Sequence, residues 1–111
     1  MANRNLFKIE MLILKVLDLH DCYGYQLAQE ISETSGGQFK IAEGTMYPIM
    51  YKLEEAGYIS GEKILVKKRQ QRVYYHLESK GKEHLAQLIS DYRTLTDAID
   101  KILESAPPDT D

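Results

Sequence analysis

Residues 42–59 limit the possible folds of this chain most strongly, because they combine a short helical pattern with two dissimilar sides. One side is an apolar stripe at helical spacing, which predicts burial: Met46, Met50, Leu53 and Ala56. The other side mixes polar and apolar groups: Thr45, Pro48, Ile49 and Lys52, with Tyr47 and Tyr51 between the two sides. Proline suits only the first turn of a helix, so the helix is expected to begin between Glu43 and Met46. Gly57 is expected to end it, and Tyr58-Ile59 to begin a strand.

A short helix with one buried side and one side bearing Tyr and Lys suits an element that reads a groove of DNA. The same pattern also fits an ordinary surface helix. The segments on either side of residues 42–59 therefore decide between these interpretations.

Two further helices are expected before this segment. Residues 6–20 are apolar almost all round, which indicates burial on more than one side and, in a chain this small, burial in part by a second subunit. Residues 24–35 form the next helix, which Gly36-Gly37 stops. Its predicted inward set is Tyr25, Leu27, Ala28 and Ile31. Residues 38–41 alternate and predict one short strand, so the order is that of a helix-turn-helix core with three helices.

Residues 58–66 and 72–77 are two strand candidates, joined by residues 67–71. Val73, Tyr75 and Leu77 alternate with polar neighbours, so one face of the second strand is predicted to be apolar. Lys67, Lys68 and Arg69 make the connection cationic. Such a run can be merely a solvated hairpin tip, but behind a helix-turn-helix we interpret it as the wing of a winged helix.

The distribution of charge supports this interpretation better than the net charge of −3 does. Residues 61–82 carry seven basic and two acidic side chains, a net charge of +5. Residues 1–60 carry five basic and eight acidic side chains, and residues 83–111 carry two and seven. Positive charge is thus concentrated in one block. Because salt screens charges that are farther away, such a local concentration suits contact with DNA phosphates.

A long helix is expected from about Ser79. Apolar side chains recur along it at alternating spacings of three and four, the pattern of a coiled-coil seam: Leu85, Leu88, Tyr92, Leu95, Ile99 and Ile102. An intramolecular packing stripe is the alternative, but the seam is longer than the small core can cover, so we expect a homodimer. Pro107-Pro108 follow the helix. The expected division is a winged helix-turn-helix DNA-binding domain over residues 1–78, a dimerisation helix over 79–105 and a disordered tail over 106–111.

Composition excludes several other classes of protein. The 111 residues include three separated His and the single Cys22, so metal-ligand spacing and internal disulfides are absent. No apolar run is long enough to cross a bilayer and no signal peptide is visible, so a cytoplasmic protein without membrane contact is expected. No catalytic constellation is present, and neither an enzyme nor a cofactor is expected.

Several short motifs resemble the PadR family of transcriptional regulators. They are Gly24-Tyr25-Gln26-Leu27, residues 43–50 (Glu-Gly-Thr-Met-Tyr-Pro-Ile-Met), Gly57-Tyr58-Ile59 and Tyr74-Tyr75-His76-Leu77. The single C-terminal helix is similar to the small subfamily. The resemblance implies an α+β, mostly α fold: a winged helix-turn-helix with a long C-terminal dimerisation helix. It also implies a repressor that binds a palindromic operator in double-stranded DNA as a homodimer and is relieved by a ligand or stress signal.

Residue by residue, the resemblance and the patterns give two sets of site residues. The DNA-binding set is Thr45, Tyr47, Pro48, Ile49, Tyr51, Lys52, Lys67, Lys68, Arg69 and Arg72. The dimer-interface set is Leu6, Phe7, Ile9, Leu85, Leu88, Ile89, Tyr92, Leu95, Ile99 and Ile102. Ala42 departs from the family, which places a polar capping residue ahead of the recognition helix. Tyr92 could line the cavity of a small-molecule effector, although core packing is the simpler interpretation of an aromatic on the seam.

Two other functions remain open. A winged helix can also serve as a protein-protein interaction module without DNA binding, which the acidic net charge would suit. Cys22 could add a redox response to DNA binding, but no Lys or Arg near it in sequence would lower the pKa of its thiol.

Overall fold

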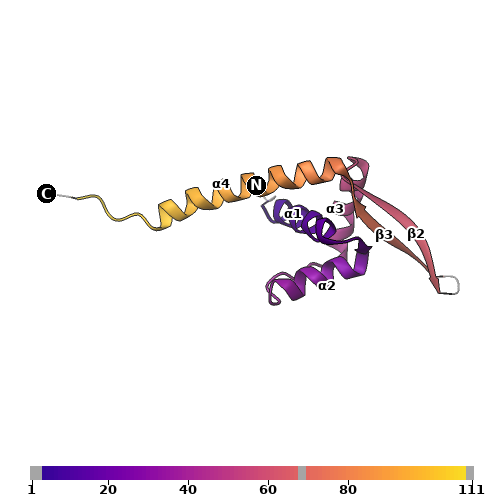
Figure 1. Cartoon of the computed structure of the whole chain (residues 1–111). Helices are drawn as coiled ribbons and strands as arrows, with labels where there is room; N and C mark the ends of the chain where they lie inside the picture. The colour runs from indigo at the N-terminus through magenta and orange to yellow at the C-terminus, as the bar shows by residue number, and fades with distance from the viewer. Residues whose placement is uncertain (1–3, 68–69, 110–111) are drawn as a thin grey trace.

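The computed structural model describes residues 4–67 and 70–109, and the side chains of residues 4–8 lie outside this description. Four helices and three strands follow in the order α1 (Arg4–Leu19), β1 (Cys22–Tyr23), α2 (Gly24–Thr34), α3 (Glu43–Glu55), β2 (Ile59–Lys67), β3 (Gln70–Leu77) and α4 (Ser79–Leu103). Helices α1, α2 and α3 cluster beside the first part of α4 (Figure 1). The far end of α4 and the β2–β3 hairpin extend in opposite directions, which makes the molecule 77 Å long. The predicted mostly helical winged fold is confirmed.

Helix α1 forms the centre of the core. Ile13 and Leu14 are completely inaccessible to solvent, and α1 contacts α2, α3, α4 and β3. The prediction of burial on several sides is therefore correct, and most of this burial comes from the chain itself. The same core includes Leu27 of α2, Met46 and Met50 of α3, and Leu85 of α4.

The three strands form one antiparallel sheet in the order β1-β3-β2. Strand β2 pairs with β3 from Ile59↔Leu77 to Lys67↔Gln70, with a bulge between Leu65 and Lys67. Strand β1 occupies the other edge of β3 through Cys22↔Tyr75 and Tyr23↔Tyr74. The hairpin was predicted from its alternation, whereas no strand was predicted at the two residues of β1.

The short strand predicted over residues 38–41 is wrong. These residues form an irregular connection, in which the hydroxyl of Ser35 accepts a hydrogen bond from the Phe39 amide at 3.0 Å. The edge of β3 opposite β2 pairs with Cys22–Tyr23, and residues 38–41 pair with neither strand of the hairpin. Alternation over four residues was too short a signal to show that a pairing partner existed.

The inward set predicted for α2 is partly wrong. Leu27 and Ile31 are buried and Ala28 packs against the core, but Tyr25 is 44% exposed. The residue that completes the buried stripe is Gly24, which lies at helical spacing from Leu27, Ala28 and Ile31. Tyr25, one position further along, is therefore turned away from the core.

Helix α3 begins at Glu43, within the predicted range, but Pro48 is its sixth residue and lies beyond the first turn. The missing N–H deprives the exposed Gly44 carbonyl of its partner within the helix. At the other end Gly57 has a φ of 82°, the Tyr58 amide donates to the Leu53 carbonyl, and the Gly57 amide donates to the Glu54 carbonyl. This Schellman arrangement ends α3 where predicted and directs the chain into β2.

Candidate nucleic-acid interface

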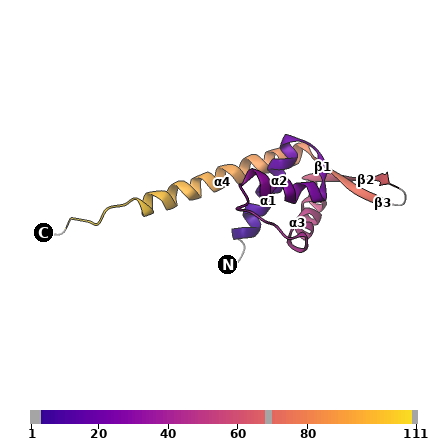
Figure 2. The ribbon, with the colours of Figure 1, turned by 90° about the horizontal axis from the view of Figure 1, so that it is seen from below.

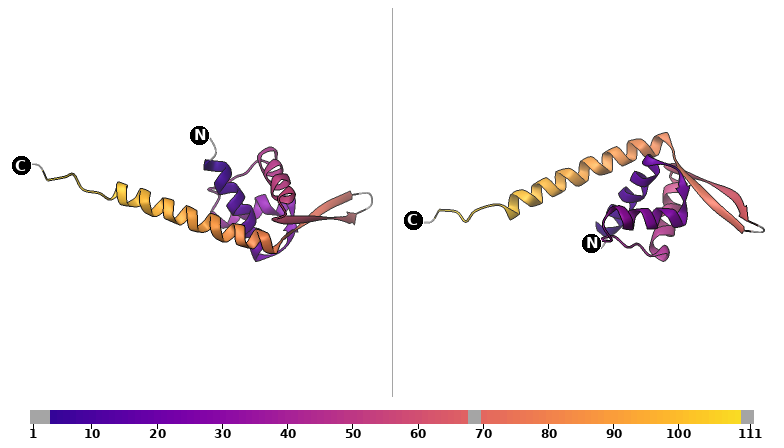
Figure 3. Two further views of the ribbon diagram at one scale, coloured as in Figure 1. Left: turned by 90° about the horizontal axis from the view of Figure 1, so that it is seen from above. Right: turned by 60° about the horizontal axis from the view of Figure 1, so that its bottom comes forward.

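Helix α3 stands beside the base of the β2–β3 hairpin, as the views in Figures 1, 2 and 3 show. Met46, Met50 and Leu53 fix it to the core. The predicted DNA-facing residues of α3 are placed on the opposite side. Those exposed to solvent are Thr45, Tyr47, Pro48, Tyr51 and Lys52, whereas Ile49 is half-buried and packs against the core.

The start of α3 has no side-chain cap. Ala42 occupies the N-cap position, as its sequence indicated, and its carbonyl accepts from the amides of Thr45 and Met46, each at 3.0 Å. The first amides of the helix are left without a side-chain acceptor, and Glu43 provides an acidic group in the first turn. An uncapped, exposed helix start has free N–H groups for an anion such as a phosphate.

The wing contributes the exposed Lys67 and Arg72. Lys68 and Arg69, the other predicted wing cations, lie outside the described residues. Arg72 is on β3 near the tip, and its guanidinium carbon lies 4.7 Å from the centroid of the Tyr25 ring, over its face. Tyr25 thus joins the start of α2 to the wing, a role that no sequence pattern suggested.

A shallow pocket of about 220 Å³ lies between the start of α2, helix α3 and the wing. Its lining consists of Tyr23, Gly24, Tyr25, Tyr47, Gln71, Arg72, Val73 and Tyr75. The pocket therefore brings together Tyr47 and Arg72, two predicted site residues that are 25 positions apart. Tyr23 and Tyr25 are site residues that sequence reasoning missed, and the only signal for them was the Gly-Tyr pair at the start of a helix.

Two tyrosines of this pocket, Tyr47 and Tyr75, have raised pKa values and keep their protons at neutral pH. Burial, and then the nearby Glu43 carboxylate, raise the pKa of Tyr47, while Arg72 partly offsets this effect. Burial, followed by Glu54 and Tyr47, raises the pKa of Tyr75. Both phenols therefore remain O–H groups that can donate a hydrogen bond to an anion.

The predicted seam of α4 is divided between two environments. Its first part packs on the protein's own core: Leu85 and Leu88 are buried, and Ile89 and Tyr92 are half-buried. Its second part is open, with Leu95 53%, Ile99 42% and Ile102 72% exposed. Among the predicted interface residues of α1, Ile9 is half-buried against the core, and the side chains of Leu6 and Phe7 lie outside the description.

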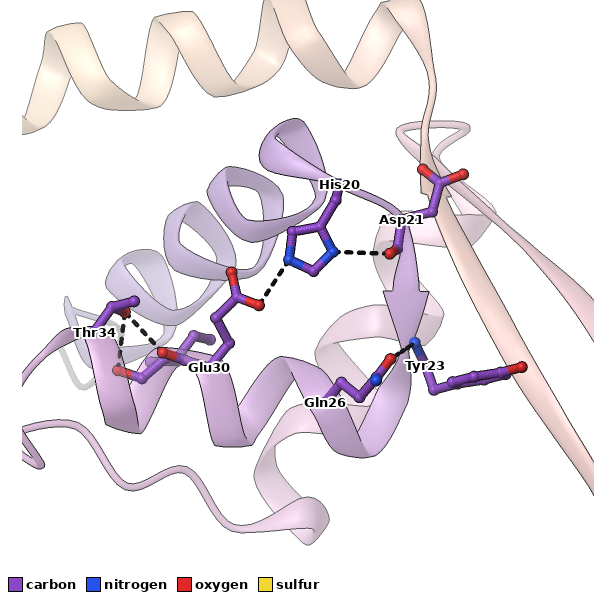
Figure 4. Close-up of polar contacts among 7 residues, drawn as sticks. His20, Asp21, Tyr23, Gln26, Glu30 and Thr34 are labelled. Atoms are coloured by element: carbon purple, nitrogen blue, oxygen red, sulfur yellow. Dashed lines mark hydrogen bonds and ion pairs between the residues drawn. The ribbon is translucent and has the colours of Figure 1, made fainter.

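The region between α1 and α2 is organised by polar contacts (Figure 4). His20 donates to the backbone carbonyl of Asp21 at 2.9 Å and contacts the Glu30 carboxylate at 2.7 Å. The Gln26 side chain accepts from the Tyr23 amide at 2.8 Å and so caps α2. Cys22 is buried nearby, and burial, with smaller effects of Glu30 and Asp21, raises the pKa of its thiol to about 11.

Within residues 4–67 and 70–109, no cluster of His, Cys, Asp and Glu is arranged to hold a metal ion. In the same part of the chain, none of the helices is both long and apolar enough to cross a membrane.

Comparison with known proteins identifies the family. The profile of the transcriptional regulator PadR-like family matches residues 13–87, which is more than half of the chain. The chain belongs to the PadR-like family of transcriptional regulators. This family regulates transcription through DNA binding and is not enzymatic, in agreement with the predicted absence of catalysis.

Several solved structures have the same architecture as this chain. A protein of Streptococcus mutans UA159 is 38% identical, covers 94% of this chain and 93% of its own, and superposes with a TM-score of 0.73. A PadR family transcription regulator from Clostridium difficile R20291 is 29% identical over 86% of this chain and 97% of its own, with a TM-score of 0.73. A transcriptional regulator from Clostridium thermocellum has the same fold, with a TM-score of 0.84 over 94% of this chain and 98% of its own, at 23% identity.

Proposed function

We propose that this PadR-like regulator is a repressor which binds a near-palindromic operator as a homodimer. The observation that carries the proposal is that the exposed side of α3 and the cationic wing border the same pocket, while the end of α4 leaves an apolar seam uncovered. Residues 1–78 would then bind DNA, residues 79–105 would form the dimer, and residues 106–111 would be a disordered tail.

In this mechanism α3 enters the major groove. Thr45, and the part of the half-buried Ile49 that the core leaves exposed, are available for the methyl group of a thymine, and Tyr47, Tyr51 and Lys52 for phosphates or base edges. Pro48 lies on the same exposed side and contributes shape rather than hydrogen bonds. The wing cations Lys67, Lys68, Arg69 and Arg72 supply attraction that does not depend on sequence.

The two copies would be joined through α4 and α1. The open residues Leu95, Ile99 and Ile102 bury their side chains against the partner copy, because a seam of this exposure is unfavourable in water. The remaining members of the proposed interface are Leu6, Phe7, Ile9, Ile89 and Tyr92. Leu85 and Leu88, which were also predicted to lie there, are already covered by the chain's own core. Two recognition helices about 34 Å apart would then meet successive turns of the major groove.

Repression would follow from exclusion of RNA polymerase from the operator. A small-molecule effector relieves repression only if it binds better to a dimer whose recognition helices are wrongly spaced. The half-buried Tyr92, where the covered and open parts of the seam meet, is the residue at which such a cavity would be expected.

The experiment is a mobility shift with the DNA upstream of the chain's own gene, at two salt concentrations. A DNA-binding dimer loses affinity steeply as salt rises, because each neutralised phosphate releases counterions. Reversing Lys67 and Arg72 to Glu should abolish the shift, whereas Lys101→Glu, far along α4 from the wing, serves as the matched control. A protein-protein interaction module predicts the opposite result: no salt-sensitive retention of DNA and no effect of the charge reversal.

A further inference from the structure

The side chains of four residues form a continuous row from the base of the wing to Arg72. The Tyr23 ring lies edge-on to Tyr74, with centroids 5.0 Å apart, and stacks on Tyr25 with centroids 6.0 Å apart and planes 10° from parallel. Tyr25 in turn carries the Arg72 guanidinium on its face. The arginine therefore lies at the end of a row of rings that begins at the half-buried Tyr74 of the sheet.

This support leaves the polar edge of Arg72 available. A guanidinium that stacks on a ring contacts it with the flat face of the guanidinium. The N–H groups of the guanidinium point outward in its own plane and remain free for another partner. Among the described residues, no carboxylate forms an ion pair with Arg72. The same pocket is also lined by Gln71 and Tyr47, residues whose side chains can donate hydrogen bonds.

The position of the pocket indicates what can occupy it. It lies between α3 and the wing, and a duplex that receives α3 in its major groove and the wing in the adjacent minor groove must pass one backbone strand between them. A strand at that place presents phosphates to Arg72 and Tyr47. Donors that converge on a concave surface suit the tetrahedral oxygens of one such group.

We propose that this pocket seats one phosphate of the DNA backbone and that Tyr25 is the positioning residue which holds Arg72 toward it. The inference rests on the proposed DNA-binding function and deepens it. Tyr25 acts through the arginine, so the ring face matters more than the hydroxyl. Gly24 leaves room for the Tyr47 ring in the same pocket, because a Cβ atom at position 24 would lie 2.5 Å from the Tyr47 hydroxyl oxygen and 3.0 Å from the Tyr47 Cε1 atom.

The test is a double-mutant cycle on operator affinity, measured by fluorescence anisotropy over a range of KCl concentrations. Arg72→Ala should reduce the slope of log affinity against log salt by about 2 for the dimer, since each lost phosphate contact in duplex DNA contributes about 0.9. Tyr25→Leu should weaken binding by about fivefold in the wild-type protein but by less than about twofold in the Arg72→Ala background, because the two residues act as one unit.

Two conservative changes sharpen the test. Tyr25→Phe keeps the ring face and should lose less affinity than Tyr25→Leu. Gly24→Ala should displace the Tyr47 ring and weaken binding by about threefold or more, while circular dichroism and thermal melting show that the variant is folded. Equal losses for the Phe and Leu variants would show that Arg72 does not depend on the ring.

The outcomes separate this inference from the proposed function. If wild-type protein binds the operator with a steep salt dependence but Tyr25→Leu and Arg72→Ala are additive or silent, the phosphate seat is wrong and the repressor proposal stands. If wild-type protein shows no salt-dependent binding, both are wrong. Inorganic phosphate at matched ionic strength should not compete with DNA; competition beyond the effect of ionic strength would assign the pocket to free anions instead.

Discussion

Gly81 lies against the backbone of Tyr58 so closely that a Cβ atom at position 81 would be 2.1 Å from the Tyr58 carbonyl oxygen. The same carbonyl accepts a hydrogen bond from the Glu78 amide at 3.0 Å. The first turn of α4 is thereby fixed to the turn that connects α3 with β2. Helix α4 carries the seam and helix α3 the exposed polar side, so this contact joins the two parts of the proposed site close to the backbone.

Gly81→Ala is expected to destabilise the fold, because backbone rather than a flexible side chain opposes the added methyl group. Overpacking of this kind costs about 1–3 kcal/mol, and a 2.1 Å approach belongs at the upper end. Urea unfolding followed by circular dichroism measures the change. Gly44→Ala is the matched control: nothing lies within 4 Å of its Cβ position, so it should be neutral or add about 0.5–1 kcal/mol of helix stability. Equal effects at the two glycines would contradict the role of the Tyr58 contact.

Ile99→Asp is expected to dissociate the proposed dimer. The side chain is 42% exposed in the single chain and would be covered by the partner copy, where an unpaired carboxylate is unfavourable. The dimer Kd should rise about tenfold or more, which corresponds to about 1.4 kcal/mol or more. Sedimentation velocity over a concentration series measures it. Thr94→Asp introduces the same charge off the seam and should leave the sedimentation profile unchanged; dissociation by both variants would mean that added charge on α4, not the seam, is responsible.

His20 is expected to make the fold more stable in mild acid. The hydrogen bond to the Asp21 carbonyl, followed by the contact with Glu30, raises the pKa of His20 above its ordinary value of 6.5. Both ring nitrogens face acceptors, so the protonated ring satisfies both. Because the folded-state pKa is the higher one, the stabilisation is fully present below pH 6.5 and is lost as pH rises through the folded-state value.

The measurement compares urea midpoints of wild type and His20→Ala at about pH 5.5 and about pH 8. The difference between the two proteins should be larger in acid. Glu30→Gln, which removes the carboxylate but keeps a polar group, should reduce this pH dependence. A difference that grows toward alkaline pH would show that the ring is stabilised in its neutral form.

Cys22 is expected to be unreactive in the folded protein. Its side chain is 1% exposed, and burial raises the pKa of the thiol to about 11, so almost no thiolate is present at neutral pH. A thiol reagent should modify the native chain far more slowly than the chain in guanidinium chloride. By linkage, the raised pKa also means that stability declines as pH rises from about 9 toward about 11. Rapid labelling of the native chain, together with oxidant-sensitive operator binding, would instead support a redox role.

Most of the fold was predictable because its elements depend on local periodicity. The stripe through Met46, Met50 and Leu53 identified α3 and its buried side, and the alternation of Val73, Tyr75 and Leu77 identified the inner face of β3. These patterns need only the geometry of one helix or strand, which neighbouring residues define. The family motifs lie in the same segments and led to the same winged fold.

The candidate site was only half predictable, because its assembly depends on contacts between segments that are distant in sequence. Tyr47 and Arg72 could be named separately, from a helix face and from a cationic hairpin. That they share one pocket, and that Tyr25 supports Arg72 there, depends on how α2, α3 and the wing pack together. Periodicity placed Tyr25 in the core because it cannot distinguish an aromatic that fills a core from one that carries a cation at the surface.

The sequence by itself determined the helices, the hairpin, the division of charge and the family, since each depends on the identity and spacing of residues that are close together in the chain. Only the tertiary structure decided that Cys22–Tyr23 would complete the sheet, that residues 38–41 would not, and that Gly24 would make room for Tyr47. Each of these results depends on contact between segments distant in sequence. Whether an edge is free or a Cβ atom fits is set by the partner segment, and no local pattern records it.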